Sequence, residues 1–297
     1  MNSGTVKHII AAIILVLCGA SSAIWGPERP QHARLSLISE HSSAAPGSTQ
    51  WIGLRFQLDS GWHIYWTNPG DSGEPPKATW HLPNRVQAGD LQFPIPQRIQ
   101  DHGLTDYGYQ GDVVLLSKIQ IPDTGMSGKI EIAADVRYLV CREVCVPGKD
   151  HVSMTLPAGK SAMPSAESEL IRIAAARLPQ ALPKGVHASA TSAQDTFLLT
   201  VTGKPANFGS VRDFIPADAQ LIENTTRPEI RDSATASLIR LKKSEQINQS
   251  VSQLRGLLIA GDSAYNVAVP ITSAKKSSQT GSAQKHVPLA NQRANKE

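Results

Sequence analysis

Short segments of alternating apolar and polar residues, separated by Pro, Gly, Asn and Asp clusters, fill most of the chain from residue 33 to residue 158. Alternation places every second side chain on one face of an extended strand, and these turn-forming residues end such strands. Helical periodicity is nearly absent in this half of the sequence. The pattern predicts strands at residues 33–39, 51–58, 62–66, 113–119, 129–140 and 151–156.

The pattern changes after residue 158. Acidic residues are followed by apolar positions at helical spacing, and Pro179 and Pro183 end that segment, which predicts a helical linker over residues 159–183. Alternation then resumes and predicts a second, smaller β domain over residues 184–273. Its expected strands span residues 187–190, 196–201, 219–223, 236–242, 256–260 and 264–271. The expected fold is mostly β: an immunoglobulin-like antiparallel β-sandwich over residues 24–158, then a short helix and the second domain.

Both ends of the chain are expected to lie outside these domains. Residues 1–23 combine Lys7, a short apolar run and small residues ending at Ala23, the pattern of a cleaved signal peptide of an exported, periplasmic protein. Residues 274–297 are expected to be a disordered basic tail. The total charge is +4; removing Lys7 and the +4 of the tail leaves −1, so a basic nucleic-acid interface is not expected. No later apolar run is long enough to span a membrane.

Cleavage after Ala23 would also remove Cys18, leaving Cys141 and Cys145 as the only cysteines. In an oxidising compartment they are expected to pair with each other. In a continuous strand, residues four apart are separated by about 13 Å, whereas a disulfide needs Cα atoms within about 7 Å. A disulfide therefore requires the chain to turn between them, and Pro147 and Gly148 suit an irregular connection.

Three functions are open for this pair. A structural disulfide closing so short a loop would contribute only about 2 kcal/mol. A redox role depends instead on access and thiolate stability, which Arg142 and Lys149 would favour and Glu143 would oppose. A metal site would use Cys141, Cys145 and His151, with Met154 as a further soft ligand, and requires reduced thiols.

An aromatic segment at residues 62–66 offers two further interpretations. Alternation places Trp62, Ile64 and Trp66 on one face of a strand and His63 and Tyr65 on the other. The segment can be a packed sandwich face or a binding platform. The following loop, residues 68–76, can form a rim beside the cysteines or be an ordinary surface loop. We find no motif for a Ser-His-Asp triad or a phosphate-binding loop.

Several motifs together resemble the N-terminal domain of the thiol:disulfide interchange protein DsbD, in the branch associated with suppression of copper sensitivity. They are Gly61-Trp62-His63-Ile64-Tyr65-Trp66, Pro69-Gly70-Asp71-Ser72-Gly73, Phe93-Pro94, Gly108-Tyr109-x-Gly111 and Tyr138-x-Val140-Cys141-x-x-x-Cys145-x-Pro147. Weaker motifs at residues 213–216, 221–224 and 254–258 resemble the second soluble region of that branch.

The resemblance implies an immunoglobulin-like domain that passes reducing equivalents by thiol–disulfide exchange, with Cys141 and Cys145 as the exchanging pair. Supporting residues would be Tyr138, Arg142, Pro147, Trp62, His63 and Tyr65. The electron donor would be a thioredoxin-like or DsbD-type membrane protein, and the acceptors would be envelope proteins with disulfides. The family also suggests roles in copper tolerance and cytochrome c maturation. No membrane electron-transfer domain follows in this sequence, so the electrons would come from a separate protein.

The hypothesis is therefore a periplasmic exchange module that needs no cofactor. One thiolate would attack a partner disulfide, and the second cysteine would resolve the mixed disulfide. The more exposed cysteine of lower pKa should attack, and our preference is Cys145. The alternatives are a non-catalytic binding module with a structural disulfide and a copper-binding protein.

Overall fold

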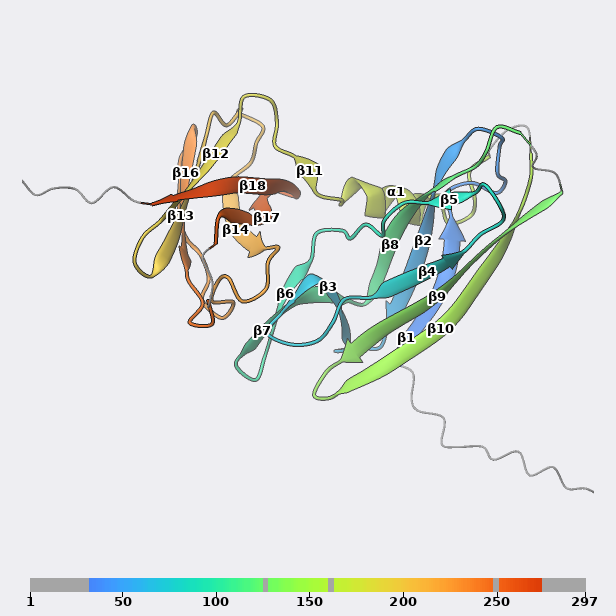
Figure 1. The fold of residues 1–297 in the computed structure, drawn as a ribbon, viewed down its shortest axis with the longest axis horizontal. Coiled ribbons are helices and arrows are strands. Elements are labelled where there is room, and N and C mark those ends of the chain that lie inside the picture. The colour runs from blue at the N-terminus through green and yellow to red at the C-terminus, as the bar shows by residue number, and fades with distance from the viewer. Residues whose placement is uncertain (1–31, 125–127, 160–162, 248–250, 274–297) are drawn as a thin grey trace, which may run out of the picture. The chain divides into compact units, whose positions relative to one another are not determined.

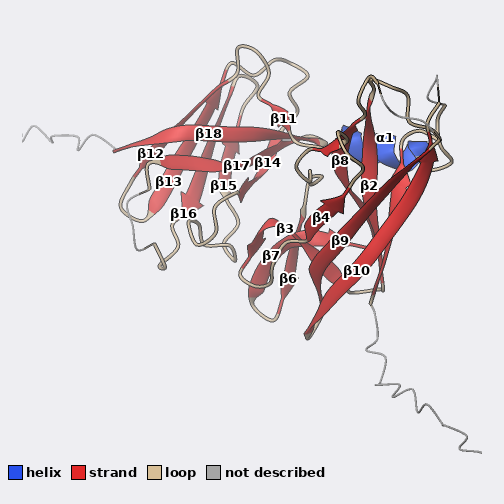
Figure 2. Cartoon of the chain, turned by 45° about the vertical axis from the view of Figure 1, so that its right-hand side comes forward, coloured by secondary structure: helices blue, strands red, loops and turns tan. Residues whose placement is uncertain are grey.

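The computed structural model of the protein describes residues 32–124, 128–159, 163–247 and 251–273. The expected signal peptide, residues 1–23, and the expected basic tail, residues 274–297, lie outside the described residues. Strands make up most of the described chain (Figures 1 and 2). We call β1 to β10 the first lobe and β11 to β18 the second lobe.

Two antiparallel sheets form the first lobe. One has the strand order β1-β2-β8-β5, with β1 at Ala33–Ser39, β2 at Thr49–Leu58, β8 at Asp112–Gln120 and β5 at Gln87–Ala88. The other has the order β10-β9-β3-β7-β6, and β4 also pairs with β9. Its strands are β10 at Cys145–Pro157, β9 at Lys129–Cys141, β3 at His63–Gly70, β7 at Leu104–Gln110, β6 at Gln97–Asp101 and β4 at Lys77–His81.

The inner faces of the two sheets enclose the main core of the first lobe. Leu54, Phe56 and Leu115 come from the first sheet, and Ile64 and Val136 come from the second; all five are fully buried in one cluster. Each such side chain contributes about 1.5–3 kcal/mol on burial. This core fixes the register of β3 and β9, the two strands on which the cysteine site depends.

The helix α1, Ser168–Ala176, covers part of the outer face of the first sheet. Ile171 and Ala174 are buried against Ile38, Val114 and Leu116. The helix thus packs on the first lobe, in addition to connecting the chain to the second.

One eight-stranded sheet forms the second lobe, in the order β14-β17-β18-β12-β13-β16-β15, with β11 pairing with β18. The strands are β11 at Gln180–Ala181, β12 at His187–Ser192, β13 at Thr196–Thr202, β14 at Val211–Pro216, β15 at Glu229–Asp232, β16 at Ala236–Lys242, β17 at Gln253–Ala260 and β18 at Ser263–Ser273. Its core includes Phe197, Leu199, Phe214, Ile239 and Leu258.

Polar contacts join the two lobes close to the loop that follows β3. The buried Asn224 accepts a hydrogen bond from the Tyr107 hydroxyl at 3.0 Å and donates one to Asp71 Oδ1 at 2.8 Å. Arg98 on β6 forms an ion pair with Asp213 on β14 at 3.1 Å. Asp71, at the start of the loop, is therefore anchored by a residue of the second lobe.

The expected fold class is confirmed: a sandwich, a short helix and a second β domain. The strand expected at residues 219–223 is wrong, because only Ile222 makes an isolated bridge there, to Lys243. Strand β6 was not expected, because its sequence has a single apolar residue, Ile99, and it is a strand through its pairing with β7.

Candidate functional site

A tight hairpin brings Cys141 and Cys145 together. Strand β9 ends at Cys141, β10 begins at Cys145, and the two cysteines are directly opposite each other in the register. Their Cα atoms lie 4.2 Å apart and their sulfurs form a disulfide. The Arg142 backbone N–H donates to the Val144 carbonyl inside the three-residue turn. The expected turn between the cysteines is thus present.

The two cysteines differ in exposure. Cys141 is 2% exposed and lies opposite His63 of the neighbouring strand β3. Cys145 is exposed, because β10 is the edge strand of its sheet. Attack on a disulfide requires an incoming thiolate to reach a sulfur atom, so Cys145 is the accessible member of the pair.

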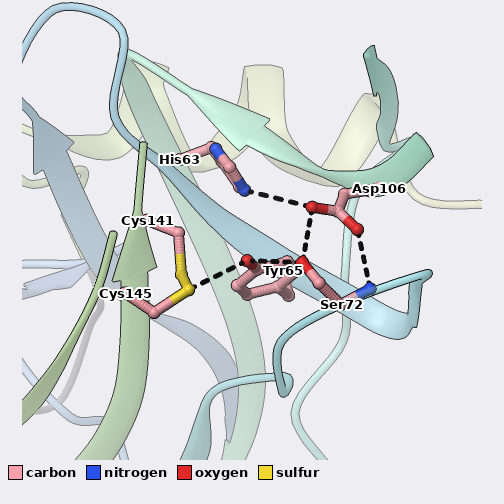
Figure 3. The surroundings of a disulfide bond; sticks show 6 residues. All are labelled: His63, Tyr65, Ser72, Asp106, Cys141 and Cys145. Atoms are coloured by element: carbon pink, nitrogen blue, oxygen red, sulfur yellow. Dashed lines mark hydrogen bonds and ion pairs between the residues drawn. A yellow bond between two sulfur atoms is a disulfide. The ribbon is translucent and has the colours of Figure 1, made fainter. Parts of the chain in front are cut away.

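The hydroxyl of Tyr65 lies beside the exposed cysteine. Its oxygen is 3.7 Å from Cys145 Sγ and 3.3 Å from Ser72 Oγ (Figure 3). Burial raises the pKa of the Tyr65 hydroxyl, so it stays protonated at neutral pH and is available as a donor. A disulfide sulfur can only accept a hydrogen bond, and a thiolate accepts a stronger one.

The loop after β3 covers the ring of Tyr65. Gly73 has φ +76°, and a Cβ at this position would lie 2.1 Å from Tyr65 Cζ. Only glycine fits at this close approach in this backbone conformation. The positions of Ser72 and Gly73 are thus consistent with a rim beside the cysteines, one of the two interpretations of residues 68–76.

A buried carboxylate extends this group of polar side chains away from the sulfur. Asp106 on β7 accepts hydrogen bonds from the Ser72 hydroxyl at 2.8 Å and from the Ser72 backbone N–H at 2.9 Å. His63 Nε2 lies 3.6 Å from Asp106 Oδ2 and has no hydrogen-bond partner. Figure 3 shows the resulting series of neighbouring side chains: Cys145, Tyr65, Ser72, Asp106 and His63.

Residues 36–157 match the family described as thiol:disulfide interchange protein DsbD, N-terminal. They form a DsbD N-terminal-like domain. The match includes both strands of the cysteine hairpin and β3, so the Cys141–Cys145 disulfide belongs to a domain of the thiol–disulfide interchange class.

Comparison with solved structures supports the same fold. The N-terminal periplasmic domain of ScsB from Proteus mirabilis aligns with a TM-score of 0.59 and 17% sequence identity, covering 82% of this chain and 95% of that chain. At this identity the likeness shows a shared fold. Titin immunoglobulin tandem domains align with a TM-score of 0.20 and 10% identity, covering 82% of this chain and 99% of that chain. The periplasmic chaperone SfaE aligns with a TM-score of 0.21 and 8% identity, covering 80% of this chain and 100% of that chain. A comparison with curated protein sequences gave no significant match.

The remaining aromatic candidates of the DsbD N-terminal domain belong mainly to its core. Trp62 is 6% exposed and stacks on His32 with ring centroids 3.6 Å apart. Tyr138 packs edge-on against Phe56, and its hydroxyl donates to Asp150 at 2.7 Å, away from the sulfurs. The tryptophan face of residues 62–66 therefore packs in the sandwich, whereas Tyr65 on the opposite face lies at the disulfide.

The charged and metal-ligand candidates lie at different distances from the pair. Arg142, in the turn, lies over the Trp62 ring at 5.5 Å and 3.8 Å from Glu143. His151 is six residues along β10 from Cys145, about 20 Å in an extended strand, and binds Asp135 at 2.8 Å. The set Cys141, Cys145 and His151 is therefore not brought together. In the described part of the chain, no group of three His, Cys, Asp or Glu side chains is suited to a metal ion.

Sequence reasoning missed Asp106 as a site residue and quoted Ser72 only within a motif. The two residues are 34 positions apart and meet because β3 pairs with β7 through a register shift between Tyr65 and Gly70. The adjacent Gly108-Tyr109-x-Gly111 motif was the only local signal. In the described segments, no helix has the length and apolar character needed to cross a membrane.

Proposed function

We propose that this chain is a periplasmic thiol–disulfide exchange protein that passes reducing equivalents from a thioredoxin-like or DsbD-type membrane donor to envelope proteins. The observation that carries the proposal is the disulfide of one exposed and one buried cysteine, Cys145 and Cys141, with a protonated tyrosine hydroxyl 3.7 Å from the sulfur of Cys145. A purely structural disulfide needs neither an accessible sulfur nor a polar donor beside it.

The exchange proceeds in two steps once the pair is reduced. The Cys145 thiolate attacks one sulfur of the partner disulfide, a Cys145–partner disulfide forms, and the partner's second sulfur leaves as a thiolate. The Cys141 thiolate then attacks Cys145 Sγ, the intramolecular disulfide forms again, and the partner's first sulfur leaves as a thiolate. Two electrons pass to the partner, and the donor protein restores the dithiol by the reverse sequence.

The polar side chains beside Cys145 would support this chemistry. The Tyr65 hydroxyl would donate to the Cys145 thiolate and so stabilise the attacking form. Ser72, which donates two hydrogen bonds to Asp106, and the adjacent Gly73 would hold the loop against the Tyr65 ring. The protein's own residues supply every group in these steps, and the proposed function requires no cofactor.

The proposal also places this chain in the branch associated with suppression of copper sensitivity and in the periplasm, and this part rests on likeness alone. The ScsB domain with the shared fold is described as periplasmic, which supports a periplasmic location here. A role in copper tolerance or cytochrome c maturation would follow from the identity of the acceptor proteins. The second lobe, which anchors Asp71, would hold the loop over Tyr65 in position.

The deciding experiment is the reduction potential of the Cys141–Cys145 pair in the protein without residues 1–23, by equilibration in glutathione and dithiothreitol buffers followed by thiol alkylation. A potential of roughly −120 to −270 mV is expected for an exchange protein. A value below about −300 mV with slow exchange would instead identify a structural disulfide and favour a non-catalytic binding module.

A further inference from the structure

Three cationic side chains lie in a row across neighbouring strands of the cysteine hairpin's sheet. Lys77 of β4 is directly opposite Arg137 of β9, which is directly opposite Lys149 of β10. All three side chains are exposed. We call Lys77, Arg137 and Lys149 the cationic row.

The cationic row is poorly compensated by carboxylates. Like charges directly opposite each other on paired strands destabilise a sheet. Lys77 has a carboxylate partner, Glu74 at 3.8 Å, and both of these side chains are more than 60% exposed. Among the described residues, no carboxylate lies within ion-pair distance of Arg137 or Lys149.

The nearest other acidic side chains on the hairpin are occupied. Asp135, two residues before Arg137, binds both His81 and His151 at 2.8 Å. Asp150 accepts the Tyr138 hydroxyl. Glu143 lies 3.8 Å from Arg142 in the turn. The fold thus concentrates positive charge at the cationic row and leaves it available to an external anion.

A groove of about 380 Å³ contains the cationic row together with Glu74, the ion-pair partner of Lys77. Its lining includes Pro75, Leu139 and Pro147 besides the three cations. Leu139 and Pro147 are directly opposite each other, midway in the register between the cationic row and the Cys141–Cys145 pair. Every second residue of β10 from Cys145 to Lys149 is exposed: Cys145, Pro147 and Lys149. Cys145, the pair of Leu139 and Pro147, and the cationic row therefore share one face of the sheet.

We propose that this groove docks an extended, acidic segment of the exchange partner. With the partner's cysteine at Cys145, an apolar residue two positions away would contact Leu139 and Pro147. A carboxylate four positions away would reach the cationic row, about 13 Å from the sulfur. This inference rests on the proposed function and specifies the chemistry of its partner. Charge complementarity and the matching two-residue steps favour a peptide segment over a small anion.

The test uses the Cys141→Ser variant of the protein, in which Cys145 is the only thiol once residues 1–23 are absent. Its probes are three C-terminally amidated pentapeptides that begin with cysteine, and this cysteine is carried as a mixed disulfide with 2-thiopyridine. The first is Cys-Ser-Val-Ser-Glu, the second is Cys-Ser-Val-Glu-Ser, and the third is Cys-Ser-Val-Ser-Gln. Attack by the Cys145 thiolate forms the Cys145–peptide disulfide, breaks the probe disulfide and releases 2-thiopyridine, which is measured by absorbance.

The first peptide is expected to react about three- to fivefold faster than the other two at low ionic strength. The second has the same charge, but its carboxylate points to the opposite side of an extended segment. The preference should disappear when Lys77, Arg137 and Lys149 are all changed to Gln. It should persist when Lys129, Lys184 and Lys242, exposed cations elsewhere, are changed to Gln, which alters the net charge equally.

Each other outcome has a defined meaning. Equal release from all three peptides, or a preference that survives loss of the cationic row, would overturn the docking proposal and leave the exchange function standing. If sulfate suppresses the preference for the first peptide more than chloride does at equal ionic strength, the docking proposal is overturned in favour of a small-oxyanion site. Absence of release from every peptide would contradict both the docking proposal and the proposed function.

Discussion

The hydroxyl of Tyr65 lies 3.7 Å from the sulfur of Cys145, although the two residues are 80 positions apart in the sequence. Tyr65 is completely buried, whereas Cys145 is exposed. A donor that is fixed from the protein interior thus meets a sulfur that a partner protein can reach. This contact indicates which chemical properties of the site should change when single residues are substituted.

Tyr65→Phe is expected to slow exchange at neutral pH. A hydrogen bond to a charged acceptor is worth about 1.5–3 kcal/mol, so its loss should raise the pKa of the Cys145 thiol by about one to two units. The ring that packs under Gly73 is retained. The measurement is the pH dependence of Cys145 alkylation in the Cys141→Ser background. Tyr138→Phe, whose hydroxyl faces Asp150, is the control, and equal effects of the two variants would exclude the role given to Tyr65.

Gly73→Ala is expected to destabilise the protein by more than 1 kcal/mol. The added Cβ would lie 2.1 Å from the Tyr65 ring, and the alanine backbone would have to adopt a positive φ. Gly103→Ala is the matched control, since Gly103 has φ +85° and no atom within 4 Å of an added Cβ. Urea unfolding of both variants separates backbone strain from the steric contact. If Gly73→Ala lowers the free energy of unfolding no more than Gly103→Ala does, the loop accommodates the added Cβ without a steric cost.

Arg137→Gln is expected to stabilise the protein by about 0.2–1 kcal/mol at low ionic strength, because it removes the central charge between Lys77 and Lys149. The gain should shrink in high salt, which screens exposed charges. Urea unfolding at two salt concentrations measures it. Arg34→Gln on β1, opposite the neutral Gln57, should change stability little in either condition. A loss of stability in Arg137→Gln would mean that packing of the arginine stem outweighs repulsion.

Asp135→Asn is expected to alter acid stability. Hydrogen bonds from His151 and His81 lower the pKa of Asp135 below its ordinary value. A lowered folded-state pKa contributes stability above the unfolded-state value, near pH 4, and that stability is lost as the pH falls through the folded-state pKa. The melting temperature of the parent should therefore fall relative to that of Asp135→Asn below about pH 4. If the melting temperatures of the parent and of Asp135→Asn change equally with pH below about pH 4, the role given to the lowered pKa of Asp135 is contradicted.

The sequence by itself determined the local features of this protein. Alternation of apolar and polar residues predicted β1 and β16 to the residue, since this alternation is a property of the segment alone. The four-residue spacing required a turn between Cys141 and Cys145, and their motif indicated the DsbD N-terminal family. Helical spacing and the two following prolines indicated α1.

Only the tertiary structure decided how these features combine. Tyr65, Ser72 and Asp106 meet through pairings between strands that are distant in sequence, and no local pattern specifies such pairings. The cationic row likewise depends on the register of β4 and β10 against β9, since a shift of one residue would move a cation to the opposite face. The difference in exposure between Cys141 and Cys145 follows from the place of β10 at the sheet edge, which the packing of all the strands determines together.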